Sequence, residues 1–101
     1  MQAKTKLTNI NATEGVSDLL EVCGRLAEQQ GMSSEVSDSV EAPGKKDGGL
    51  ITGLIVGVAA PLIVDLLRAA AKAAFAHRKP LEDDVISIDG KDYKLVELIE
   101  E

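Results

Sequence analysis

The sequence predicts one small α+β domain in which two helices pack on one face of a sheet. Residues 14–30 repeat apolar side chains at the three- and four-residue spacing of an amphipathic helix. Residues 49–78 form a long apolar stretch rich in glycine and alanine, which we interpret as a second helix. Residues 84–98 contain two short β-type runs around an Asp-Gly turn, the pattern of a β-hairpin. Together these elements favour helices on one side of a small antiparallel or mixed sheet.

The composition restricts the class of partner. The chain has 101 residues, enough for a single domain with a modest core. Aromatic residues make up only 2%, so few side chains can stack on bases or sugars. The net charge of −6 would repel a phosphate backbone. We therefore expect no nucleic-acid partner and a core built from leucine, isoleucine, valine and alanine.

The sequence lacks the residue clusters of an enzyme or a metal site. The single cysteine, Cys23, lies on the apolar stripe of the first helix, which indicates core packing and excludes an internal disulfide. The single histidine, His77, lies in a basic segment near a helix end, with no second histidine or cysteine spaced to join it. We expect no enzymatic activity, no metal and no cofactor. A lone cysteine without a secretory signal is typical of a cytoplasmic protein.

The first segment, residues 3–10, is polar and reads as a weak strand at the edge of the sheet. Lys4 and Lys6 would discourage that edge from pairing with another chain. In the following helix, 14–30, the Asn11 and Glu14 pair has the spacing of a capping box, and Gly31 predicts the C-terminal end.

Residues 32–48 are rich in serine, glycine and acidic side chains, which is typical of a flexible linker. Val36 and Val40 leave room for a short strand near 35–41. We therefore expect one domain over residues 1–101, with its flexible part at about 32–48.

The apolar helix 49–78 is the predicted interaction surface. Gly49, Gly53 and Gly57 recur every four residues, and Ala60 continues this row of small residues. Such spacing forms a smooth groove on one side of a helix, which another backbone can approach closely. Pro61 removes a backbone hydrogen bond, so we expect a kink near it.

Three uses of this groove remain open. It can pack within the domain, against a partner or second copy, or inside a bilayer. The uncharged run Gly48–Val64 would span about 26 Å as a helix, slightly less than the ~30 Å hydrocarbon core. Extending it would bring Asp65 and Arg68 into the lipid, which is costly. We therefore predict a protein contact, with membrane insertion as a small pore or anchor protein as the alternative.

The C-terminal hairpin has two possible registers. A type I′ loop at Asp89-Gly90 places Ile88 opposite Lys91. A type II′ loop at Gly90-Lys91 places Ile88 opposite Tyr93 and gathers the apolar residues on one face. We predict the second register for that reason.

The order of these segments resembles a known group of proteins. The stretch VEAPGKKDGG leads into an apolar helix, and VISIDGKDYKLVEL closes the chain as a hairpin. In this arrangement the chain resembles the effector-associated constant component families of bacterial conflict systems. The resemblance implies a small, non-catalytic α+β domain that accompanies variable effectors as an adaptor or assembly part. Our functional expectation is accordingly a protein-protein interaction module, acting with a protein partner or as a homo-oligomer.

Overall fold

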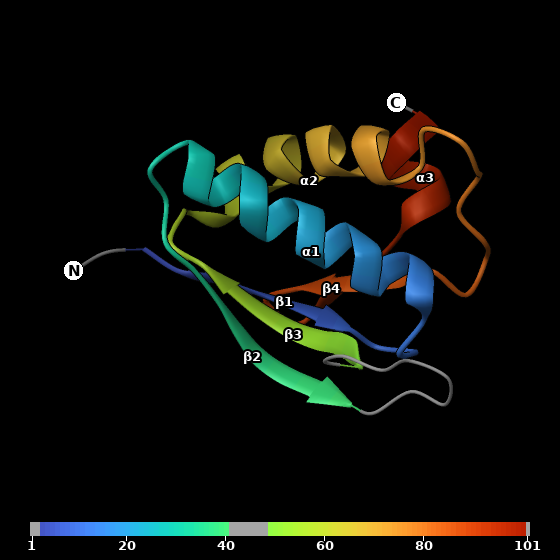
Figure 1. Ribbon diagram of the computed structural model, residues 1–101, viewed down its shortest axis with the longest axis horizontal. Helices are drawn as coiled ribbons and strands as arrows, with labels where there is room; N and C mark the ends of the chain where they lie inside the picture. Colours follow the sequence, from blue (N-terminus) through green and yellow to red (C-terminus); the bar gives the residue numbers. More distant parts are fainter. Residues whose placement is uncertain (1–2, 41–48, 101) are drawn as a thin grey trace.

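The structure, a computed structural model, describes residues 3–40 and 49–100 (Figure 1). Within these residues three helices and five strands follow one another, and the predicted α+β class is confirmed. They are β1 (Thr5–Asn9), α1 (Glu14–Gln29), β2 (Ser34–Val40), β3 (Leu50–Val56), α2 (Ala60–Ala74), β4 (Val85–Ile88), β5 (Lys91–Lys94) and α3 (Leu95–Glu100).

The five strands form one antiparallel sheet in the order β2-β3-β1-β4-β5. The first strand is therefore central, and the prediction that it lies at an edge is wrong. The polar residues of β1 suggested an exposed edge strand, but they are buried and their side chains form hydrogen bonds. The Thr5 hydroxyl donates to the Val58 carbonyl at 2.6 Å, and the Asn9 amide donates to the Thr13 carbonyl at 2.9 Å. Between them Leu7 is fully buried.

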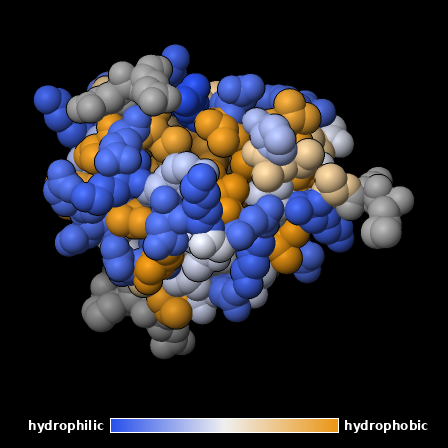
Figure 2. Space-filling model, turned by 180° about the vertical axis from the view of Figure 1, so that it is seen from behind, coloured by the Kyte–Doolittle hydropathy of each residue, from blue (hydrophilic) through white to orange (hydrophobic). Residues whose placement is uncertain are grey.

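The helices gather on one side of the sheet, and the core lies between the two layers (Figure 1). α1 packs on β3 and also runs along α2. Its contribution to the core is a single apolar stripe: Val16, Leu19, Leu20, Cys23 and Ala27. The face seen from behind carries hydrophobic residues in groups separated by hydrophilic ones (Figure 2).

α1 confirms the predicted helix 14–30, but a different residue caps it. The Thr13 side chain accepts the hydrogen bond from the Val16 amide at 3.3 Å. Asn11, the predicted cap, instead donates from its side chain to the Asp83 carbonyl at 2.9 Å. The helix ends before Gly31, whose φ of 82° only glycine adopts easily.

The predicted helix 49–78 is wrong over its first part, which forms strand β3. β3 has the sequence LITGLIV, in which β-branched residues favour a strand and the internal glycine disfavours a helix. α2 then begins at Ala60, so Pro61 lies in its first turn. A backbone N–H has no helical partner there, and proline is tolerated without a kink.

The second helix also ends earlier than predicted, at Ala74 rather than residue 78. Beyond it the Arg78 guanidinium lies 2.8 Å from the Asp18 carboxylate of α1 and stacks over the Phe75 ring, 5.4 Å from its centroid. The chain turns at Phe75 and bends over residues 76–78, before Lys79 and Pro80.

The hairpin is confirmed, but its register is the one that we did not predict. Ile88 pairs with Lys91, and Asp89 and Gly90 have φ values of 52° and 91°, both positive as a type I′ loop requires. A contact with the central strand holds this turn. The Lys6 amide donates to the Asp89 carboxylate at 2.9 Å, and the Asp89 amide donates to the Lys6 carbonyl at 2.9 Å.

After β5 the chain forms the short helix α3 at Leu95–Glu100, where we predicted strand. Leu95 and Leu98 thereby enter the core. In the described part of the chain, none of the helices combines the length and apolarity needed to cross a bilayer. The membrane alternative depended on a continuous helix 49–78, which is not formed.

Candidate protein-binding groove

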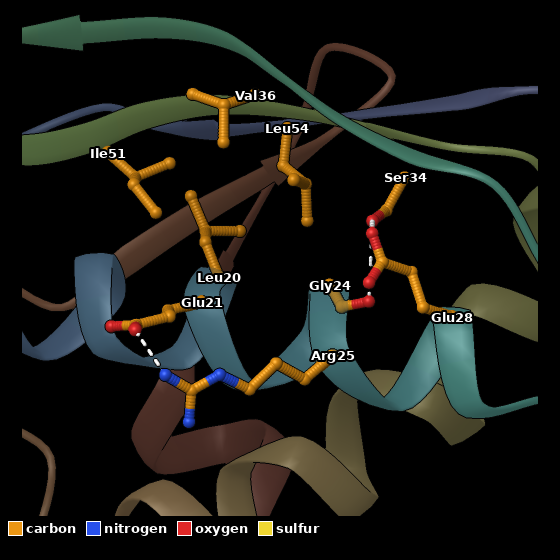
Figure 3. Close-up of a pocket in the computed structure, with 9 residues that line it drawn as sticks. All are labelled: Leu20, Glu21, Gly24, Arg25, Glu28, Ser34, Val36, Ile51 and Leu54. Carbon is orange, nitrogen blue, oxygen red and sulfur yellow. Dashed lines mark hydrogen bonds and ion pairs between the residues drawn. The ribbon is translucent and has the colours of Figure 1, made fainter.

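A groove runs between α1 and the outermost strand β2, with a volume of about 200 Å³ (Figure 3). We call it the α1–β2 groove. Nine residues line it: Leu20, Glu21, Gly24, Arg25, Glu28, Ser34, Val36, Ile51 and Leu54.

The floor of the groove is aliphatic. Leu20 of α1 and Leu54 of β3 are buried core residues, and Ile51 packs beside them. Val36 of β2 faces the same space but is 50% exposed, since no described element covers it from the outer side. The close-up shows these four side chains turned toward one another across the groove (Figure 3). An apolar ligand group placed here would remove Val36 from water.

The rim of the groove is polar and held in place. On α1, the Arg25 guanidinium pairs with the Glu21 carboxylate at 2.7 Å. The Ser34 hydroxyl of β2 lies 3.2 Å from the Glu28 carboxylate and 3.3 Å from the Gly24 carbonyl. Gly24 lies beside Ser34 without crowding, since a Cβ added there would stand 3.5 Å from the Ser34 hydroxyl.

The free side of β2 adds backbone hydrogen-bonding groups to this groove. The Gly57 amide donates to the Ser33 carbonyl at 2.8 Å, so Ser33 directs its backbone toward β3. Backbone groups alternate along a strand, so those of Ser34 and Val36 point away from β3. β2 has no further neighbour among the described strands. These N–H and C=O groups are thus available to a ligand.

The groove and its edge are mainly acidic. Glu35 of β2 is exposed, as are the rim carboxylates Glu21 and Glu28. Asp38, also on β2, pairs with Lys6 at 3.6 Å. β2 departs from regular pairing at Asp38, where its register with β3 shifts. Such irregularities twist an edge strand and limit the length over which it can pair.

The residues predicted from the sequence do not form one helical face. Gly53 lies in β3 against Ser37 and Asp38 of β2, where an added Cβ would stand 2.9 Å from the Asp38 carboxylate. Gly57 follows β3 and contacts the Ser33 hydroxyl. Both glycines permit close approach between neighbouring strand segments, and not in the predicted groove on a helix. None of the predicted residues lines the α1–β2 groove.

The other three predicted residues lie apart, because strand β3 and the turn after it stand between Gly49 and the start of α2. Gly49 precedes β3 with a φ of 62°, and Ala60 and Pro61 open α2. Next to Ala60 and Pro61 is a second hollow of about 420 Å³, in which Gly57 and the 58% exposed Leu62 lie with Met32. It lacks a free strand edge and any charged lining residue, so it offers less to fix a partner in one orientation.

The titratable side chains that attract attention in the sequence lie elsewhere. Cys23 is in the core, and burial raises its pKa from 9.0 to about 12. The thiol therefore stays protonated and unreactive at neutral pH. His77 is exposed in the bend after α2. Across residues 3–40 and 49–100, no three His, Cys, Asp or Glu side chains are grouped so as to hold a metal ion.

Comparison with family models, with curated proteins and with solved structures finds no match. The resemblance to the effector-associated constant component families stays a prediction. By its fold, the chain belongs to the class of two-layer α+β domains with an antiparallel sheet covered by helices on one side.

The groove is not evident from the sequence because its two walls belong to separate segments of the chain. In the sequence, Val36 indicates only a short possible strand, and Glu21 and Arg25 belong to the polar face of a helix. A usable signal is present in residues 34–40, where the β-branched Val36 and Val40 are separated by polar residues close in sequence to the amphipathic helix. It could not show that this strand would lie at the edge, because edge position depends on the order of strands in the sheet.

Proposed function

We propose that this protein is a non-enzymatic interaction module that binds a protein partner in the α1–β2 groove. One observation carries the proposal: an aliphatic groove opens beside a strand whose backbone groups have no neighbour among the described strands. An exposed strand edge is a ready template for another chain, and monomeric proteins usually block it. Here Val36 and Val40 are 50% and 45% exposed on that edge.

The chemistry of the groove favours a protein over a small polar substrate. Its buried floor is hydrocarbon, and its polar groups are already paired with each other at the rim. Binding would therefore depend on apolar contact and on backbone hydrogen bonds, both of which a polypeptide supplies. An adaptor or assembly role in a bacterial effector system, as the resemblance implies, requires a surface of this kind.

Site-specific photo-crosslinking tests the proposal. A benzoylphenylalanine placed at Arg25, on the rim, should give a discrete adduct in the cells that produce the protein, and mass spectrometry should identify a protein partner. The matched control places the same group at Ala69, an exposed residue of α2 outside the groove. An adduct from Arg25 but not from Ala69 supports the proposal.

A second variant links the adduct to the groove itself. Substitution Val36→Lys keeps the strand but places a long charged chain over the aliphatic floor, so the Arg25 adduct should be lost. Equal adducts from both positions, or an adduct that survives Val36→Lys, would assign partner binding to another surface.

A further inference from the structure

The proposed function leaves open what kind of polypeptide enters the groove. We propose that the occupant is an extended segment of a partner protein that pairs with β2 as an additional strand and carries basic side chains. This inference rests on the proposed function and specifies its ligand. The argument uses the backbone of β2, the face of the groove and the charges around it.

The backbone geometry favours a strand. Ser34 and Val36 direct both backbone groups away from β3, while their side chains face α1. A segment lying beside them can exchange hydrogen bonds with both residues. The irregularity near Asp38 limits regular pairing to the first part of β2. The expected contact is therefore short and centred on Val36.

The side-chain pattern of the partner follows from this arrangement. Alternate side chains of an added strand would point to the helix-covered face of the sheet. There they would meet Val36, Ile51 and the aliphatic stem of Arg25. We therefore expect aliphatic residues at every second position of the partner segment.

The charges favour lysine or arginine between those aliphatic residues. Glu21 and Glu28 lie at the rim of the groove. Glu35 and Asp38 lie on β2. Glu35 alternates with Ser34 and Val36 and so faces away from α1, the side to which these intervening partner residues would point. The two basic groups among them, Arg25 and Lys6, are already paired with Glu21 and Asp38. An acidic segment would add like charge to this surface, whereas a basic one would reduce repulsion and associate faster.

The same charges disfavour a second copy of this chain as the occupant. Pairing β2 with another β2 would bring Glu35 and Asp38 of both copies together, and like charges facing each other across strands are destabilising. The opposite edge, β5, has only four residues and exposes Lys91 and Lys94. A short strand with edge lysines discourages pairing.

Three labelled peptides test the inference by fluorescence anisotropy and amide chemical shifts. The first is eight residues long and alternates lysine with valine. The second replaces each lysine with glutamate. The third keeps the lysines but has N-methyl groups on the backbone amides of one edge, so it cannot donate hydrogen bonds there. We expect the first to bind at least about tenfold more tightly than either other peptide, with shifts centred on Ser34 and Val36.

Two variants of the protein provide the matched control. Val36→Pro removes the free amide of β2, and proline is tolerated at an edge position whose N–H faces solvent. Val36→Thr changes the side chain by a similar volume but keeps the amide. The lysine peptide should bind Val36→Pro at least about tenfold more weakly than Val36→Thr. Circular dichroism verifies that both variants fold, and the N-methylated peptide tests the same point on the unaltered protein.

Each other outcome overturns the inference. Equal binding of the methylated and unmethylated lysine peptides would show attraction without strand pairing, and equal binding of the glutamate peptide would exclude charge selection. If no peptide binds, the inference fails whether or not the Arg25 crosslink identifies a partner, so the proposed function is judged separately. A dimer mass by light scattering that falls to a monomer in Val36→Pro would assign the edge to a second copy.

Discussion

The carboxylate of Asp84 lies directly against the Cα of Gly15, so that a Cβ added to Gly15 would stand 2.8 Å from both carboxylate oxygens. Asp84 is only 3% exposed and accepts a hydrogen bond from the Leu81 amide at 2.8 Å. It is also at the N-terminal end of α1, where the helix dipole favours negative charge. This contact joins the start of the first helix to the segment that leads into β4.

Substitution Gly15→Ala should destabilise the protein although alanine is the better helix former. The new methyl group would overlap a buried carboxylate that is held by its own hydrogen bond, and such overpacking costs about 1–3 kcal/mol. Urea denaturation followed by circular dichroism measures this loss.

Gly24→Ala is the matched control in the same helix. Its Cβ would lie 3.5 Å from the Ser34 hydroxyl and 3.8 Å from Leu54, which are ordinary contacts. The variant should gain up to about 1 kcal/mol from helix propensity. A Gly15→Ala protein as stable as Gly24→Ala would contradict the close contact with Asp84.

Gly90→Ala should destabilise the C-terminal hairpin. Gly90 has a φ of 91°, a conformation in which an L side chain costs roughly 1–2 kcal/mol. Thermal unfolding should show a lower midpoint for this variant. Asp92→Asn, at an exposed position of β5, should stay within about 0.5 kcal/mol of the unaltered protein. Comparable stability of the two variants would argue against the type I′ turn.

Pro61→Ala distinguishes the observed helix from the continuous one that we predicted. In the first turn of α2, proline removes no helical hydrogen bond, so the substitution should change stability by less than about 1 kcal/mol. In the interior of a helix 49–78, replacing proline by alanine would instead stabilise the protein by about 3 kcal/mol. Chemical denaturation distinguishes these two changes in stability. The larger gain would support the predicted kinked helix 49–78 over the observed strand and helix.

The buried thiol of Cys23 should make stability depend on alkaline pH. Burial raises its pKa from 9.0 to about 12, so the unfolded chain releases this proton at lower pH than the folded protein. The stabilisation is complete below pH 9.0 and is lost as pH rises toward about 12. Urea unfolding at about pH 8 and about pH 10 should show a larger loss for the unaltered protein than for Cys23→Ala, which lacks the titrating group.

The same residue offers a direct chemical test. At neutral pH a disulfide reagent should modify Cys23 only after urea unfolds the protein, because the native thiol is buried and protonated. Rapid labelling of the folded protein would contradict the packing of α1 on the sheet.

Helix α1, the C-terminal turn and the α+β class could be predicted because their signals are local. The apolar residues from Val16 to Ala27 recur with the period of a helix, and their spacing does not fit a strand. Asp-Gly marks a turn in either register, because both residues tolerate positive φ. The register itself was decided by the contact between Lys6 and Asp89, which join distant parts of the chain. Cross-strand packing within the hairpin alone suggested the other register.

The spacing of Gly49, Gly53 and Gly57 does not by itself distinguish a helix from a strand. A spacing of four fits a helix, but it is also an even number, so it places residues on one face of a strand as well. Gly53 and Gly57 allow close approach in either case. Only the position of β3 between β1 and β2 decided that the segment is a strand and that these glycines meet Ser37 and Ser33.

By itself, then, the sequence determined the fold class, the first helix, the final turn and the absence of a signal for nucleic-acid binding. Periodicity and turn chemistry depend only on residues close together in the sequence, and net charge is a sum over the chain. These features can therefore be predicted without the tertiary structure. The tertiary structure decided that β1 is central, that 50–56 is a strand and that β2 lies beside α1 at an open edge. The order of strands in a sheet depends on contacts between distant segments, and the candidate groove exists only because of that order.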